Sequence, residues 1–325
     1  MFDLIKRLSE AFGVSGNEEG IRETIINEIK NDVQEISVDT LGNLIAIKRG
    51  KGKKIMVAAH MDEIGVMATY IDENGFIRFS NVGGVSQFVS IGQKVKFKNG
   101  TIGALFYEDK LEDMKSLKLA KMYIDIGAKD RKEAEKSVRI GDVACFVGDA
   151  VKQGNMVISK AIDDRSGCAV LIKAIKELPE TDNEIYFVFT VQEELGLRGA
   201  KTAAYQIKPD IAIAIDVTAT GDTPEAILME VKCGSGPAIK IKDRSIICHP
   251  EVKNLLEESA QRIDIPYQFE ILEFGGSDPG AIHISAGGVP SGAISIPCRY
   301  LHSPVEAASL MDIENAVKLL IEAIK

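Results

Sequence analysis

The apolar run from Ile185 to Val191 is followed, one residue later, by two adjacent carboxylates, Glu193 and Glu194. A short apolar run of this kind is typical of a strand that is covered on both faces of a sheet. Two like charges this close in a site cannot both be solvated comfortably, so at least one of them needs a cation. The pair therefore predicts a buried strand whose end faces a positive charge.

Two further apolar runs end in residues that can bind a cation. The run 55–59 is followed by His60, and the run 211–215 is followed by Asp216. Ligands of open α/β sheets bind beyond the carboxyl ends of the strands, so three such ends predict one shared site. A single acid at a strand end is explained equally well by the chain leaving the core, but three coincidences favour a site.

Three other segments also carry residues that fit the same site. Asp62 can accept the second N–H of a metal-bound His60 imidazole and so fix its orientation. Asp163 and Asp164 open a helix, where an N-cap accounts for one carboxylate and a bridge between two cations accounts for the other. His302 lies in a loop after the run 292–296; taken alone, it is equally well explained as a surface histidine.

This set of side chains indicates a pair of divalent metal ions. Imidazoles together with carboxylates suit Zn²⁺, Co²⁺ or Mn²⁺ better than Ca²⁺. In two-metal hydrolases the ions lie about 3.5–4 Å apart and share a water. If Glu194 binds a metal ion, Glu193 is free to act as a general base beside that water.

The order of periodic segments predicts an α/β fold interrupted by an insertion. Residues 1–64 and 161–325 alternate strands with helices, which implies a mainly parallel central sheet. Helices are expected over 3–12, 17–31, 250–263 and 311–324. Residues 65–160 instead show short alternating segments and turns, including a hairpin at 95–105, which predict an inserted β-rich domain.

Composition excludes several classes of protein. The chain carries a net charge of −9 and no Lys/Arg-rich block, which argues against nucleic acid as a partner. No stretch approaches the roughly 20 apolar residues that span a bilayer, and the N-terminus lacks the apolar stretch of a signal peptide. Five scattered cysteines without a C-x-x-C pair indicate free thiols. We therefore expect a cytoplasmic protein that binds neither nucleic acid nor membrane.

Six segments, in this order, resemble the co-catalytic metallo-aminopeptidases of peptidase family M42, and the resemblance covers essentially the whole chain. The segments are AAHMDEIG (58–65), AIDDRSGCAV (161–170), VQEELGLRGA (191–200), AIDV (214–217), GGSDPGAIHIS (275–285) and RYLHSPVE (299–306). The resemblance implies a phosphorylase/hydrolase-like zinc-peptidase domain and an inserted β-barrel or PDZ-like domain that mediates assembly. It also implies dimers that build a tetrahedral homododecamer.

The resemblance assigns a role to each candidate residue. His60 and Asp216 are implied as ligands of one metal ion, Glu194 and His302 as ligands of the other, and Asp163 as the bridge. Glu193 is implied as the catalytic base and Asp62 as the residue that orients His60. The resemblance also implies peptide substrates and two metal ions per subunit, Zn²⁺ or Co²⁺ and less typically Mn²⁺. The loop with Ser277 and Asp278 is expected to shape the substrate pocket, and Arg299, Arg244 and Lys240 are candidates for a cation in it.

Three alternatives compete with a peptidase. Some family members carry an endoglucanase label, but an endo-1,4-β-glucanase (cellulase) usually uses two carboxylates without metal. The absence of tryptophan and an aromatic fraction of 6% disfavour a sugar-binding cleft. A two-metal deacylase or carboxypeptidase would share the ligand set, so that only its substrates would distinguish it. A non-catalytic assembly protein would not need Glu193 and five ligands together.

Overall fold

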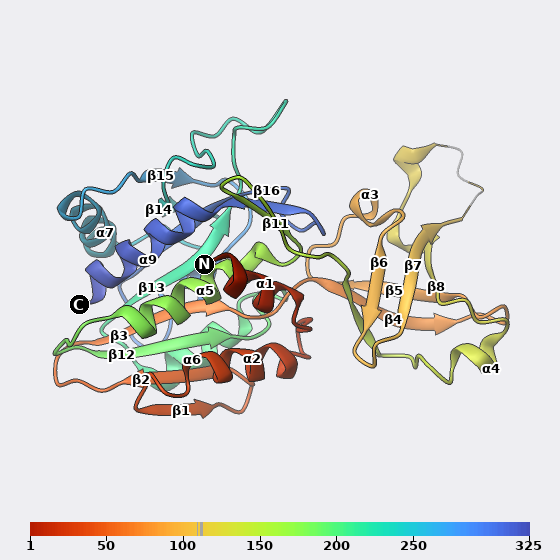
Figure 1. Cartoon of the computed structure of the whole chain (residues 1–325), viewed down its shortest axis with the longest axis horizontal. Helices are drawn as coiled ribbons and strands as arrows, with labels where there is room; N and C mark the ends of the chain where they lie inside the picture. The colour runs from red at the N-terminus through yellow and green to blue at the C-terminus, as the bar shows by residue number, and fades with distance from the viewer. Residues whose placement is uncertain (109, 111–112) are drawn as a thin grey trace.

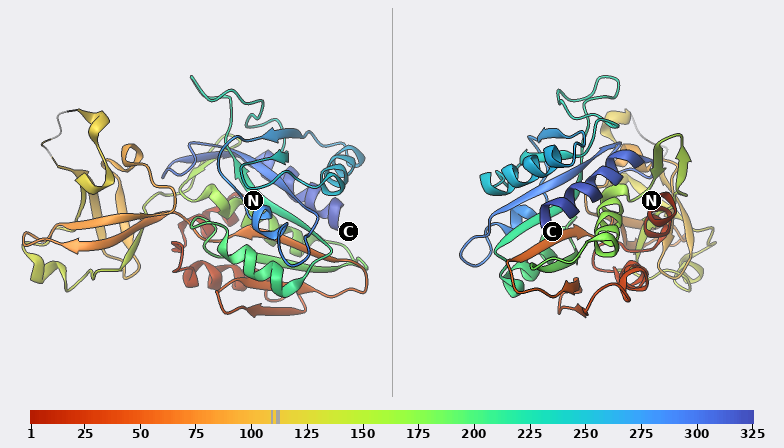
Figure 2. Two further views of the ribbon diagram at one scale, coloured as in Figure 1. Left: turned by 180° about the vertical axis from the view of Figure 1, so that it is seen from behind. Right: turned by 60° about the vertical axis from the view of Figure 1, so that its left-hand side comes forward.

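The computed structural model describes residues 1–108, 110 and 113–325. It shows a larger α/β body, which contains both termini, and a smaller barrel beside it (Figure 1). The view from behind shows the same arrangement (Figure 2). The predicted α/β class with a β-rich insertion is confirmed.

In the described residues, an eleven-stranded mixed sheet forms the core of the larger body. Its four central strands run parallel in the order β12 (Glu184–Thr190), β3 (Lys54–His60), β13 (Ile211–Thr218) and β16 (Ser291–Arg299). Every residue of β13 is buried. The parallel centre agrees with the sequence-based prediction, because these strands are the apolar runs with candidate ligands at or beyond their ends.

Antiparallel strands extend the sheet on both sides, so the sheet as a whole is mixed rather than uniformly parallel. They are β2 (Leu44–Lys48) and β1 (Glu35–Val38) beyond β12, and β17 (Glu306–Ser309), β11 (Met156–Ser159) and β10 (Val151–Gln153) beyond β16. Strand β14 (Ala238–Lys242) also pairs with β16, and β15 (Gln268–Ile271) pairs with β14.

Helices cover both faces of the sheet because successive side chains of each strand point to opposite faces. In β3, Ile55 and Val57 pack with one set of helices, and Met56 and Ala58 pack with the other. The first set is α1 (Phe2–Glu10), α2 (Glu19–Ile29), α5 (Ile162–Glu177), α7 (Pro250–Arg262) and α9 (Leu310–Ile324). The second set is α6 (Arg198–Ile207) and the short α8 (Pro279–Ile282).

The smaller body is a closed barrel with a separate apolar core. Its strands, in spatial order, are β4 (Gly65–Ile71), β5 (Ile77–Val82), β8 (Met122–Asp125), β7 (Ile102–Tyr107), β6 (Lys94–Phe97) and β9 (Val143–Phe146). Strands β6 and β7 form the predicted hairpin. Short helices α3 (Gln87–Ser90) and α4 (Arg131–Ala134) and two 3-10 turns, Met114–Ser116 and Leu119–Lys121, complete it.

The barrel strands end earlier than the 65–160 range proposed from the sequence. Strands β10 and β11 lie within that range, but β11 pairs with β17 in the large sheet. Val157 of β11 is buried in the core of the larger body, which explains why this segment pairs there. Residues 65–146 therefore span the barrel strands.

Candidate metal centre

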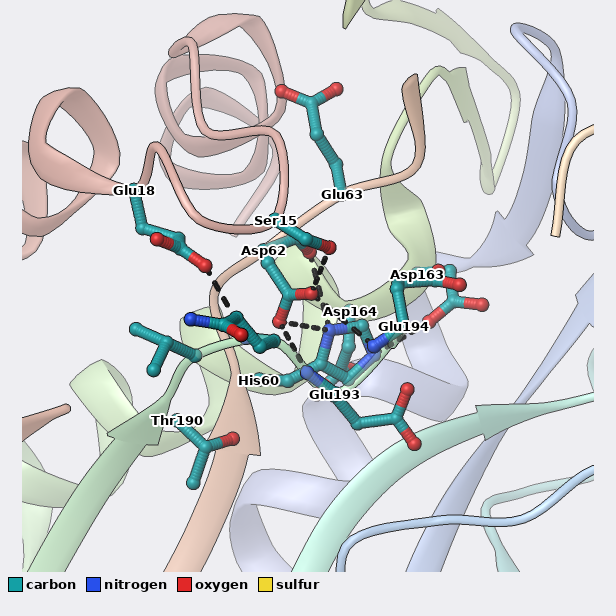
Figure 3. A network of polar contacts seen from close by, with 12 residues as sticks. Ser15, Glu18, His60, Asp62, Glu63, Asp163, Asp164, Thr190, Glu193 and Glu194 are labelled. Carbon is teal, nitrogen blue, oxygen red and sulfur yellow. Dashed lines mark hydrogen bonds and ion pairs between the residues drawn. The ribbon is translucent and has the colours of Figure 1, made fainter. Parts of the chain in front are cut away.

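The candidate ligands meet at one edge of the sheet because neighbouring parallel strands end together. Thr190 of β12 is in register with His60 of β3, and β13 reaches Asp216 beside them. Asp163 lies at the start of α5, and His302 follows β16. Figure 3 shows His60, Asp163 and Glu194 gathered at this edge, with Asp62 and Ser15 next to His60.

Two groups of side chains have the geometry of a metal site. In the first, His60, Asp163 and Asp216 each offer a ligand atom, and these atoms lie within 4.8 Å of one another. His60 Nε2 lies 2.9 Å from Asp163 Oδ1 and 3.9 Å from Asp216 Oδ1. All three residues are buried.

The second group contains Asp163, Glu194 and His302. His302 Nε2 lies 3.4 Å from Asp163 Oδ2 and 3.3 Å from Glu194 Oε1. Asp163 thus faces His60 with one carboxylate oxygen and His302 with the other. This is the arrangement that a carboxylate bridging two cations requires.

The electrostatics of the site also fit bound cations. Burial raises the pKa of Glu194, and it raises the pKa of Asp216 to about 8. Burial opposes the charged form of His302, but the carboxylates of Asp163 and Glu194 outweigh it and raise its pKa to about 12. Carboxylates outnumber imidazoles here, and this excess of buried negative charge is what divalent cations neutralise.

Glu193 belongs to neither ligand group, although it lines the same cavity. Burial raises its pKa well above the ordinary value, and the nearby Asp216, Asp278 and Glu194 carboxylates raise it further. A carboxyl group that readily takes up a proton and lies beside candidate metal ligands can act as a general base.

Asp62 lies beside His60, but its carboxylate also has other partners. His60 Nδ1 is 3.2 Å from the Asp62 carbonyl oxygen and 3.5 Å from Asp62 Oδ1. The carboxylate accepts hydrogen bonds from the Ser15 hydroxyl at 2.6 Å and from the backbone amides of Glu193 at 3.0 Å and Glu194 at 3.2 Å. It therefore joins the ends of β3 and β12.

Glu306 is a residue of this site that sequence reasoning missed. Its buried carboxylate accepts hydrogen bonds from the backbone amides of Asp163 at 3.0 Å and His302 at 2.8 Å. Burial raises its pKa to about 8. An acid that opens a fully buried strand four residues after His302 was the available sequence signal.

A cavity of about 790 Å³ opens beside the two groups. Its lining includes the candidate ligands and Glu193, an apolar part with Val217, Leu272, Phe274 and Leu301, and the cations Lys240 and Arg244. Lys240 is buried, forms an ion pair with Glu270 and lies 3.4 Å from Asp243 Oδ2. Arg244 is exposed.

The three residues proposed for the substrate pocket lie in different places. Ser277 lines the cavity, and its hydroxyl donates to Asp243 Oδ2 at 2.6 Å. Asp278 is buried behind it and accepts the Thr190 hydroxyl at 2.5 Å. Arg299 pairs with Asp222 at 2.6 Å and is not among the described residues that line the cavity.

Comparison with known proteins shows the family of the chain. The family model described as M42 glutamyl aminopeptidase matches residues 42–319. A putative aminopeptidase of Acetivibrio thermocellus is 76% identical over 324 residues, which cover 100% of this chain and 98% of that protein. An aminopeptidase structure from Desulfurococcus kamchatkensis has a TM-score of 0.96 and 39% identity, covering 99% of this chain and 94% of that one.

Two other solved structures bear on assembly and on the glucanase alternative. A Pyrococcus horikoshii peptidase that can assemble into a tetrahedron or a large octahedral shell is 36% identical, with a TM-score of 0.90 over 99% of this chain and 98% of that one. A Thermotoga maritima structure named as an endoglucanase is also 36% identical, with a TM-score of 0.85 over 99% of this chain and 96% of that one.

Among the residues that the structure describes, none of the helices combines the length and the apolar character that a bilayer crossing needs.

Proposed function

This chain belongs to the M42 aminopeptidase family, and on that basis we propose that it removes amino acids from the N-terminus of peptides at a centre of two divalent metal ions. The observation that carries the two-metal proposal is the position of Asp163. Its two oxygens face two separate ligand groups, so one carboxylate can serve both ions.

The candidate ligands would hold two ions in the following way. His60 and Asp216 would bind one ion, Glu194 and His302 would bind the other, and Asp163 would bridge them. Imidazole and carboxylate donors suit Zn²⁺ or Co²⁺, with Mn²⁺ also compatible. When bound, the ions would polarise the scissile carbonyl group and lower the pKa of a water.

Glu193 supplies the proton transfer. Its carboxylate takes a proton from the attacking water and returns it to the nitrogen of the leaving amine. Two features support this role: Glu193 lies outside both ligand groups, and its surroundings favour the protonated form. Asp62 holds the backbone of Glu193 and thereby fixes the origin of its side chain.

Assembly into a homo-oligomer is part of the proposal. The similar P. horikoshii peptidase supports it, because that protein forms tetrahedral or octahedral shells. We propose that the barrel, residues 65–146, contributes the contacts between subunits and that dimers build a dodecamer. Light scattering of the purified chain measures the number of subunits directly.

The glucanase alternative has weak support from the site. Phe274 is the one Phe, Tyr or Trp side chain in the described lining of the cavity, whereas sugar-binding clefts use several aromatic platforms. The site also gathers imidazoles with carboxylates, which a two-carboxylate glycosidase does not need. A deacylase with the same ligands is distinguished only by its substrates.

The test is a substrate panel with the metal-stripped protein, reloaded separately with Zn²⁺, Co²⁺ or Mn²⁺. We expect hydrolysis of aminoacyl-p-nitroanilides only after reloading, and none of their N-acetylated analogues or of β-glucan. Equal cleavage of the acetylated substrates would favour a deacylase or endopeptidase. Full activity on β-glucan in the presence of a chelator would favour the glucanase.

A further inference from the structure

A turn of the barrel, Gly83–Gly84 between β5 and α3, contacts the candidate metal centre. We propose that this turn is a working part of the metal centre: it orients His302 and seats Glu194, and so controls the affinity of one metal site without affecting the other. The inference rests on the proposed two-metal function. It gives the barrel a role in catalysis within its own subunit, in addition to assembly.

The first observation is a hydrogen bond across the two bodies. His302 Nδ1 lies 3.0 Å from the carbonyl oxygen of Gly84, which is 218 residues away in the chain. A carbonyl oxygen only accepts, so Nδ1 carries the proton and donates it. In the neutral form of the ring, which is the form that binds a metal ion, the lone pair is therefore on Nε2, the atom that faces Asp163 and Glu194. Metal-binding histidines are typically oriented in this way through their second nitrogen.

The second observation is the closeness of the turn to both side chains. A Cβ atom at Gly84 would lie 2.3 Å from His302 Nδ1, and one at Gly83 would lie 2.9 Å from Glu194 Oε2. Gly83 also has a φ of +76°, in the left-handed region that favours glycine. Two consecutive glycines therefore let the backbone of the barrel touch two ligands of the same proposed ion.

The turn is itself held in place. The Asn81 side chain donates from Nδ2 to the Gly83 carbonyl oxygen at 2.7 Å, and the Val85 amide donates to the same oxygen at 3.1 Å. Asn81 is exposed, so its side chain can be shortened without opening a core. This gives a milder way to loosen the turn than adding a methyl group to it.

Among the described residues, the His60 and Asp216 side chains show no such contact with the barrel. The described hydrogen bonds and ion pairs of the His60 and Asp216 side chains are all with residues of the larger body, such as Asp62 and Val217. Disturbing the turn should therefore act on the site formed by Glu194 and His302, while the site formed by His60 and Asp216 stays intact.

The test compares Zn²⁺ binding by calorimetry in the metal-stripped wild type, Gly84→Ala and Asn81→Ala. Wild type should bind two ions. Gly84→Ala should keep one site at wild-type affinity and weaken the other about 10–100-fold, the range seen when an outer-shell partner is lost. Asn81→Ala should weaken the same site less. Gly287→Ala is the control, because a Cβ there meets nothing within 4 Å.

Two results would overturn the inference: two unchanged sites in Gly84→Ala, or equal weakening of both sites in a variant that melts at the wild-type temperature. If Gly84→Ala fails to fold, Asn81→Ala tests the inference in its place: one metal site should be weakened and the other unchanged. A wild-type protein that binds none of Zn²⁺, Co²⁺ and Mn²⁺ would instead refute the proposed function, so the two failures are distinguishable.

Discussion

The carboxylate of Asp62 accepts a hydrogen bond from the backbone amide of Glu193, which is 131 residues further along the chain, at 3.0 Å. Its other oxygen accepts the amide of Glu194 at 3.2 Å. One buried side chain therefore fixes the backbone of the proposed base and of a proposed metal ligand, beside the imidazole of His60. Chemistry that depends on sub-ångström placement of a base needs this kind of support.

Replacing Asp62 with asparagine should weaken metal binding. The substitution keeps the shape but turns one acceptor oxygen into a donor that faces an N–H group. We expect about 10–100-fold weaker Zn²⁺ binding and a loss of about 1–3 kcal/mol in the free energy of unfolding. Calorimetry and urea denaturation measure the two effects. The control is Asp32→Asn, which changes an exposed aspartate and should match wild type. Wild-type Zn²⁺ binding together with wild-type stability in Asp62→Asn would refute the role of Asp62.

Removing the Glu306 carboxylate should weaken both metal sites. Glu306 holds the amide of Asp163, which serves both ligand groups, and the amide of His302. Glu306→Ala should lower the affinity for both Zn²⁺ ions. Glu306→Gln keeps one acceptor oxygen, so its affinity for Zn²⁺ should lie between that of Glu306→Ala and that of wild type. This pattern differs from the single-site loss expected for Gly84→Ala. Selective loss of one ion in Glu306→Ala would contradict the shared role.

The metal-free protein should lose stability as Glu18 ionises. Burial, together with the nearby Asp62 charge, raises the pKa of Glu18 from 4.5 to about 7, so the folded state favours the protonated form. The stabilisation is complete below the unfolded pKa and is lost as the pH rises through the folded pKa. Relative to Glu18→Gln, wild type should lose on the order of 1–3 kcal/mol between about pH 5 and about pH 8. Urea denaturation measures the free energy of unfolding of both proteins at each pH. If this free energy changed with pH in the same way in wild type and in Glu18→Gln, the role of Glu18 would be excluded.

Breaking the ion pairs of Glu63 should destabilise the junction between the two bodies. This buried carboxylate is 2.5 Å from Lys160 Nζ and 3.3 Å from Arg165 Nη2, and it lies just before β4. Glu63→Ala leaves two buried cations without their partner and should cost about 3–5 kcal/mol. The control is Glu19→Ala, whose pair with Lys98 is exposed and should contribute at most about 1 kcal/mol. Equal effects of the two substitutions would contradict this account.

The sequence predicts the ligand-bearing strands well because their signal is local. Apolar runs before His60 and Glu193, and the run that leads into Asp216, mark buried parallel strands, and such strands end at one edge. The sequence predicts less well where the barrel ends and which antiparallel strands extend the large sheet. Strand β11, for example, looks like the preceding barrel strands until its pairing with β17 is known.

The supporting contacts could not be read from the sequence, because they join residues far apart in the chain. Glu306 meets Asp163 across 143 residues, and Gly84 meets His302 across 218. Neither Glu306 nor Gly84 has a local pattern that names its partner. Asp62 was predicted to support His60, but its bonds to the amides of Glu193 and Glu194 depend on the pairing of β3 with β12.

The most direct test of the account is the substitution Glu193→Gln, measured for both metal content and turnover. If Glu194 binds a metal ion and Glu193 transfers the proton, the substitution should separate the two functions. We predict two bound ions per subunit, as in wild type, with kcat on an aminoacyl-p-nitroanilide reduced at least about 100-fold. Turnover close to wild type with both ions bound would contradict the assignment of the base, and loss of an ion would make Glu193 a ligand.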